Sequence, residues 1–205
     1  VAQEKSGLNY FFPTLIALIV MFVGLFLASS LEVRERSERA AFKNMITPTS
    51  RWVFVLANFV TSMLVIITQL TVLFAIAVFF FKEQLVHVFF PVTGMLLVIA
   101  GLFILLGTLI GMIFKSPETT VVGALSLGFI LLFLSSTVLP VEAMPAVMAK
   151  IIPYNPFYAA QFVLSKLLLF QSSLKELLPM VLVLGGWLMG LAVLVLVTTT
   201  VRRNE

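Results

Sequence analysis

Residues 31–51 read LEVRERSERAAFKNMITPTSR and stand between two long apolar runs. They contain eight of the chain's 22 charged residues (13 basic, nine acidic), which are Glu32, Arg34, Glu35, Arg36, Glu38, Arg39, Lys43 and Arg51. Charged side chains are costly in hydrocarbon, so a cluster of this size is expected to face water between two membrane spans.

The same segment has the pattern of an amphipathic helix. Glu32/Arg36 and Glu35/Arg39 are acid–base pairs four residues apart with the acid first, which is the favourable order on a helix. Phe42, Met45 and Ile46 follow with apolar spacing, and Pro48 ends the pattern. The mixture of acids and bases favours docking to a protein groove over binding to anionic lipid alone.

Composition places the whole chain in a membrane. It is 61% hydrophobic and only 11% charged, with a mean hydropathy of +1.16, whereas soluble domains carry about 25% charged residues. The net charge of +4 belongs to basic residues beside the apolar runs, which indicates membrane topology and not nucleic-acid binding. The sequence has no Cys, no Asp and a single His, His87. This excludes a disulfide, a two-His metal site and a Ser-His-Asp triad within the chain.

Five apolar segments are long enough to cross a bilayer, given about 20 residues per crossing. They cover residues 10–30, 52–81, 88–114, 119–139 and 177–201. Residues 140–172 are interrupted by four prolines, Pro140, Pro145, Pro153 and Pro156, and hold a polar stretch of about 14 residues after Asn155. Asn155 followed by Pro156 predicts a helix N-cap with proline at the first position. We expect this segment to be re-entrant or interfacial and not to cross.

Basic residues orient these spans. Eight of them fall in short segments on one side, namely Arg34, Arg36, Arg39, Lys43, Arg51, Lys115, Arg202 and Arg203. The positive-inside rule makes that side cytoplasmic, with the N-terminus of the chain outside and the C-terminus inside. An outside N-terminus leads us to expect an upstream span before Val1.

Polar residues inside the apolar segments are candidate pathway or interface positions. Asn58, Ser62 and Gln69 lie near one face of the second span and predict contacts with another helix or a wet cavity. Gly107/Gly111 and the glycines at 123, 128, 185, 186 and 190 predict close helix packing.

Three further residues are open between a structural and a chemical role. Ser135 and Ser136 precede Leu139-Pro140 and are expected to satisfy backbone groups where a helix ends, a nucleophile being the alternative. Glu142 is either a solvated loop residue or an ionisable group at the outer mouth of a pathway. We predict no catalytic residue and no metal site, and His87 is expected to be a polar boundary residue.

The order of these motifs resembles the membrane subunit of an ABC-2 type transporter. The matching residues are the acid/base run 32–36, the stretch 45–51 entering a long span, Ser135 to Pro140 with Glu142 and Met144-Pro145, and 152–156. The resemblance implies an all-α integral membrane domain with five spans here, a cytoplasmic coupling helix within 31–51, and short re-entrant extracytoplasmic helices in 140–172.

The resemblance also implies partners and a function. Glu32, Arg34, Glu35, Arg36, Glu38, Arg39, Phe42, Lys43, Met45 and Arg51 would dock on a separate ATP-binding cassette subunit, which would hold ATP and Mg²⁺, because this chain has no phosphate-binding Gly-xxxx-Gly-Lys-Ser/Thr motif. A second permease copy or a homologous permease, and membrane lipids, would complete the assembly in the cytoplasmic membrane. The expected function is export of a lipid-like, drug-like or other amphipathic substrate. The alternatives are an intramembrane enzyme using Ser135, Ser136 or Glu142, and an assembly subunit without transport activity.

Overall fold

The computed structural model describes residues 7–35, 51–81, 84–137, 144–170, 172–173 and 175–201, and within these ranges the chain is helical without strands. The long helices are α1 (Gly7–Glu35), α3 (Arg51–Phe81), α4 (Gln84–Ile113) and α8 (Leu178–Val201). The shorter elements are α5 (Pro117–Phe133), α6 (Ala146–Ile151), the 3-10 turn η2 (Ile152–Tyr154) and α7 (Pro156–Phe170). The predicted all-helical membrane architecture is confirmed.

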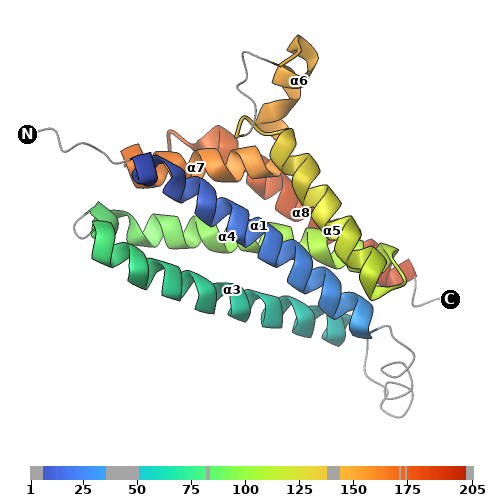
Figure 1. Ribbon diagram of the computed structural model, residues 1–205. Coiled ribbons are helices and arrows are strands. Elements are labelled where there is room, and N and C mark those ends of the chain that lie inside the picture. Colours follow the sequence, from blue (N-terminus) through green and yellow to red (C-terminus); the bar gives the residue numbers. More distant parts are fainter. Residues whose placement is uncertain are drawn as a thin grey trace, which may run out of the picture.

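Helices α1 and α4 form the centre of the bundle, with α3 on one side and α5, α7 and α8 on the other (Figure 1). Helices α1, α4 and α8 run toward the end at which α3 and α5 begin (Figure 1). We call this end, formed by Glu35, Arg51, Ile113, Pro117 and Val201, the Glu35 end. The opposite end, where α1 begins and α7 terminates, is the Thr14 end.

Glycines on α4 bring it against α1. A Cβ atom added to Gly107 would lie 2.7 Å from the Leu25 carbonyl oxygen, and one added to Gly111 would lie 2.6 Å from that of Ser29. Only glycine allows backbones to approach this closely in a membrane, where association depends on van der Waals packing. The predicted packing role of Gly107 and Gly111 is therefore confirmed, and α1 and α4 form one closely packed pair.

Four helices are long and apolar enough to cross a membrane in the described part of the chain, over Phe11–Glu35, Trp52–Ala75, Phe89–Ile113 and Leu178–Val201. The predicted first span, 10–30, is too short by five residues, because α1 continues through Glu35 into the charged segment. Residues 31–35 thus belong to the first long helix and not to a separate coupling helix.

The span predicted over 119–139 requires a correction in length. Helix α5 has 17 residues and ends at Phe133, so it extends about 25 Å, less than the roughly 30 Å of a hydrocarbon core. At the end of the helix, the Ser135 hydroxyl and the Ser135 amide both donate to the Leu132 carbonyl oxygen, at 2.6 and 3.1 Å. The expectation that Ser135 satisfies a backbone group at a helix end is confirmed.

The segment predicted to be re-entrant forms the short elements α6, η2 and α7. Helix α7 begins as predicted, since Asn155 Oδ1 accepts hydrogen bonds from the Phe157 and Tyr158 amides at 2.9 and 3.4 Å, with Pro156 at the first position. Its 15 residues extend about 22 Å, too short to cross. It leads back to the Thr14 end, whereas α6 projects away from the bundle (Figure 1).

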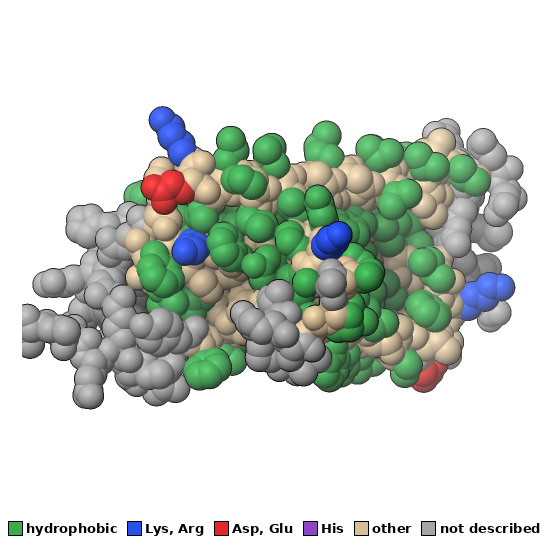
Figure 2. All heavy atoms as spheres, turned by 90° about the horizontal axis from the view of Figure 1, so that it is seen from above, with side chains coloured by type: hydrophobic (Ala, Val, Ile, Leu, Met, Phe, Trp, Pro, Cys, Tyr) green, Lys and Arg blue, Asp and Glu red, His purple; other side chains and the backbone are tan. Residues whose placement is uncertain are grey.

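Large apolar side chains cover the outside of the bundle. Figure 2 shows hydrophobic side chains over most of the face from which α6 projects. Helices α8 and α3 are the long helices with the least burial inside the chain. A surface of this kind matches a lipid environment, in which exposed Leu, Val and Phe side chains carry no cost.

Candidate functional site

At the Glu35 end, a hydrogen bond joins the last turn of α1 to α3. Asn58 Nδ2 donates to Glu35 Oε2 over 3.0 Å, and Asn58 is only 6% exposed. Residues 35 and 51 are also the described residues on either side of the charged segment 36–50. The predicted interhelical role of Asn58 is therefore confirmed, and its partner is one of the charged residues expected to dock.

Some of the predicted docking residues that the structure describes are buried and others are exposed. Glu32 is 3% exposed and packs on α4, because a Cβ added to Gly111 would lie 2.7 Å from Glu32 Cβ. Glu35 is half-buried and faces α3, whereas Arg34 is exposed. Two of the predicted docking acids thus turn inward. Since α1 continues to Glu35, the helix itself carries these residues on different faces.

Several predicted docking positions lie outside the described residues, namely Arg36, Glu38, Arg39, Phe42, Lys43 and Met45. Arg51 is the first residue of α3, and its side chain is not described. Two more charged residues lie at the same end, Lys115 in the α4–α5 connection and Glu118 in the first turn of α5, and both are exposed. The Glu35 end therefore presents charge from three elements.

Not every residue of the polar face predicted on α3 has a hydrogen-bond partner among the described residues. Ser62 is fully buried, and its hydroxyl has no hydrogen-bond partner among the described residues. Gln69 is half-buried, and no hydrogen bond of its side chain is found in the described part of the chain. Asn58 is the member of this face that is seen to join two helices.

At the Thr14 end, Gln161 of α7 bonds to two other elements. Gln161 Nε2 donates to Thr14 Oγ1 of α1 over 3.1 Å, and Gln161 Oε1 accepts from Thr137 Oγ1 over 2.8 Å. The Ser135 hydroxyl lies 2.9 Å from Thr137 Oγ1. We call Thr14, Ser135, Thr137 and Gln161 the Gln161 network. Only Ser135 of these four was a predicted site residue. Gln161 could have been noticed in the sequence as an amide within an otherwise apolar helix. That signal does not identify Thr14 and Thr137 as its partners.

The start of α7 is held by two bonds to backbone carbonyl oxygens. Asn155 Nδ2 donates to the Leu131 carbonyl of α5 over 2.8 Å, which satisfies a carbonyl in the last turn of that helix. Trp187 Nε1 of α8 donates to the Tyr154 carbonyl over 2.8 Å. Asn155 therefore caps α7 with one atom of its amide and ties it to α5 with the other.

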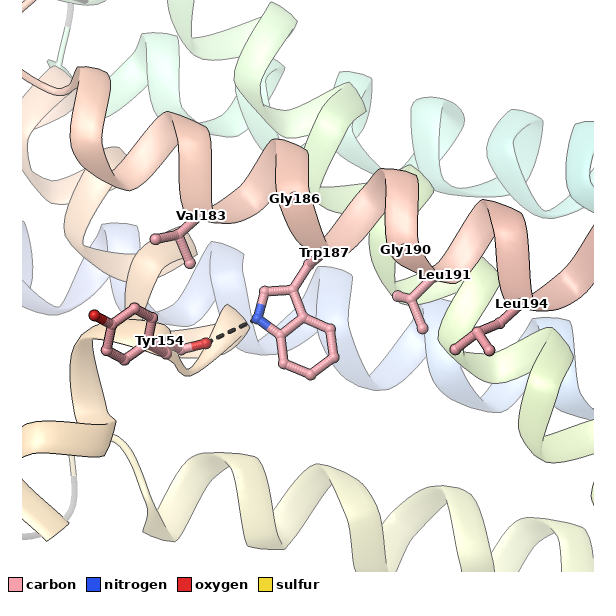
Figure 3. Close-up of a pocket in the computed structure, with 7 residues that line it drawn as sticks. All are labelled: Tyr154, Val183, Gly186, Trp187, Gly190, Leu191 and Leu194. Carbon is pink, nitrogen blue, oxygen red and sulfur yellow. Dashed lines mark hydrogen bonds between the residues drawn. The ribbon is translucent and has the colours of Figure 1, made fainter. Parts of the chain in front are cut away.

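A shallow groove runs along α8 beside this junction. It has a volume of about 310 Å³ and is lined by Tyr154, Val183, Gly186, Trp187, Gly190, Leu191 and Leu194. Figure 3 shows the aromatic residues at one end and the leucines at the other. A Cβ on Gly185, Gly186 or Gly190 would meet nothing within 4 Å. The predicted packing role of these three glycines is therefore not seen among the described residues.

The contacts of Ser135 do not support a role as a nucleophile. Its side chain is fully buried, and its hydroxyl contacts the Leu132 carbonyl and the Thr137 hydroxyl, neither of which is a base. Ser136 is half-buried beside it. Glu142 lies outside the described residues, as does the side chain of His87. The part of the chain that is described contains no group of three or more His, Cys, Asp or Glu side chains able to hold a metal ion.

Apolar helices of crossing length define a multi-pass membrane protein. The family model described as ABC-2 family transporter protein matches residues 2–200. The chain therefore belongs to the ABC-2 transporter family, as its motifs predicted, and is a membrane component of an ABC transporter. A comparison with curated proteins finds no match. Permeases of this family generally work with an ATP-binding cassette subunit.

Proposed function

We propose that this chain is the permease subunit of an ATP-driven exporter, paired with a second permease and with ATPase subunits that bind ATP and Mg²⁺. The observation that carries the proposal is the Glu35–Asn58 hydrogen bond. It ties together the two helices that border the charged segment 36–50. The docking surface would then consist of Arg34, the segment 36–50, Arg51 and Lys115.

Movement of the ATPase subunits would reach the membrane through α1. A push on 36–50 acts on the last turn of α1 and the first turns of α3, which the Glu35–Asn58 bond holds together. Helix α1 is in turn packed on α4 through Gly107 and Gly111. Closely packed helices move as rigid bodies, so a displacement at Glu35 is transmitted to Thr14 at the other end of α1.

The proposed orientation follows from charge. The Glu35 end would lie in the cytoplasm and the Thr14 end outside the cytoplasmic membrane, because short basic segments remain on the cytoplasmic side. The apolar outer surface, with the half-buried amide of Gln69 on α3, supports export of a lipid-like, drug-like or amphipathic substrate.

A pull-down experiment tests the docking surface. Arg34 and Lys115 are exposed at the Glu35 end, so the Arg34→Glu/Lys115→Glu variant should lose most of the ATPase subunit that copurifies with the full-length protein. The matched control is Lys150→Glu/Lys175→Glu, which reverses two exposed bases outside that end. Binding equal to that of the native protein in the first variant would refute the docking surface, provided that both variants reach the membrane in equal amounts.

A further inference from the structure

Gln161 occupies the place at which three elements meet. Its amide donates to Thr14 of α1 and accepts from Thr137, which follows α5, so a single side chain connects α7 to both neighbours. Thr14 and Ser135 are 8% and 0% exposed. Polar groups in a nonaqueous environment need partners, and the Gln161 network supplies them from within the chain.

Apolar packing and hydrogen bonds together hold α7 in this position. The buried face of α7 includes Phe157, Ala160 and Leu164, which are in contact with the bundle core. In a membrane, helix association depends on van der Waals packing and interhelical hydrogen bonds, because no hydrophobic driving force acts between helices there. Hydrogen bonds are the directional part of this association, and Gln161 provides two of them.

The contacts at the start of α7 differ in kind from those at Gln161, one to two turns later. The first residues of α7 are fixed by Asn155 to a carbonyl of α5 and by Trp187 to the Tyr154 carbonyl. Gln161, six residues after Asn155, is held by side-chain hydroxyls alone, and hydroxyls rotate readily to new partners or water. The geometry thus combines a fixed start of the helix with an exchangeable contact one to two turns later.

We propose that Gln161 is a positioning residue for transport: its bonds to Thr14 and Thr137 hold α7 against α1 in the resting state and break when α1 is displaced. Helix α7 then turns about Asn155 and opens the Thr14 end. This inference rests on the proposed function, because the displacement of α1 comes from the ATPase subunit. The displacement of α1 acts on α7 through the Thr14–Gln161 hydrogen bond.

Cysteine cross-linking tests the proposal directly, since residues 1–205 contain no cysteine, and the protein without the introduced pair gives the background. The Thr14→Cys/Gln161→Cys variant of the full-length protein, in membranes with its copurifying ATPase, is treated with a short bifunctional methanethiosulfonate. We expect efficient cross-linking without nucleotide and a several-fold lower yield after trapping with ATP and vanadate. The control pair is Phe22→Cys/Phe129→Cys, which joins α1 to α5, where the native rings are 5.5 Å apart; its yield should not change.

Equal yields for the Thr14/Gln161 pair in both states, with ATPase binding and ATP turnover intact, would overturn the proposed role of Gln161 and leave the permease function standing. Absence of any copurifying ATPase would refute both together. These two results are therefore distinguishable.

A second measurement avoids the loss of Thr14. Ala160 is fully buried on α7, so an Ala160→Cys reporter should react slowly with a maleimide. Gln161→Leu is expected to increase that rate several-fold in the absence of nucleotide. The matched control is Gln69→Leu, which replaces a half-buried glutamine of α3 that has no hydrogen bond among the described residues. An unchanged rate in Gln161→Leu would contradict the proposal.

Discussion

The Asn58 amide donates a 3.0 Å hydrogen bond to the Glu35 carboxylate, and so the last turn of α1 is joined to the first third of α3. Asn58 is almost fully buried, whereas Glu35 is half-buried at the edge of the membrane-spanning region. A bond of this kind is stronger than a neutral one because its acceptor is charged. It also means that the acid closest to the segment 36–50 is already engaged inside the chain.

Replacement of Asn58 by leucine should lower the stability of the protein by on the order of 1 kcal/mol, because the Glu35 carboxylate loses its buried partner. Thermal unfolding in detergent measures this effect. The matched control is Thr61→Leu, which changes an exposed position on the same helix. Identical unfolding temperatures for the two variants would show that the bond contributes nothing to the fold.

Two glycine substitutions should have opposite outcomes. Gly107→Ala is expected to destabilise the protein by about 1–3 kcal/mol, since its Cβ would lie 2.7 Å from the Leu25 carbonyl oxygen of α1. Gly186→Ala should be neutral or slightly stabilising, because no atom of the described residues lies within 4 Å of the added Cβ and alanine favours helix. Thermal unfolding of both variants provides the comparison. If Gly107→Ala unfolds at the native temperature, the close packing of α1 on α4 is not as described.

The two bonds of Asn155 can be separated by substitution. Asn155→Ala removes both the N-cap of α7 and the donor to the Leu131 carbonyl, and should cost about 0.5–2 kcal/mol for the cap with a further loss for the donor. Asn155→Asp keeps an oxygen for the Phe157 amide but loses the donor. Its stability should therefore fall between that of the alanine variant and that of the native protein. The interpretation fails if aspartate is as destabilising as alanine.

The proposed orientation predicts a labelling pattern in intact cells. Lys175 and Lys115 are both exposed in the structure, and the first is expected outside and the second in the cytoplasm. A membrane-impermeant maleimide should therefore modify Lys175→Cys but not Lys115→Cys until the cells are opened. Residues 1–205 contain no cysteine, so the signal of the introduced residue is the difference from the purified protein without the substitution. Labelling of Lys115→Cys in intact cells would reverse the topology and remove the docking surface from the cytoplasm.

Local features of the sequence were sufficient for the class of protein and for most helices. Hydropathy summed over about 20 residues identifies a span whatever it packs against. The cap at Asn155 depends on its own amide and the next few backbone groups, and for this reason α7 begins where it was predicted. The span over 119–139 was too long because hydropathy continues past Phe133, whereas the helix ends at Phe133, where the Ser135 hydroxyl and amide both donate to the Leu132 carbonyl oxygen.

Pairing between distant residues was decided by the tertiary structure. Glu32 and Glu35 looked like surface acids in a charged run, but the continuation of α1 turns one toward Gly111 and the other toward Asn58. Glycines four residues apart pack against α1 at Gly107 and Gly111. The same spacing at Gly186 and Gly190 meets none of the described residues. Gln161 and Thr14 are 147 positions apart. A hydrogen bond requires atoms within about 3 Å, and only the packed arrangement of helices brings such distant side chains together, whereas hydropathy and capping act within a few turns of one helix.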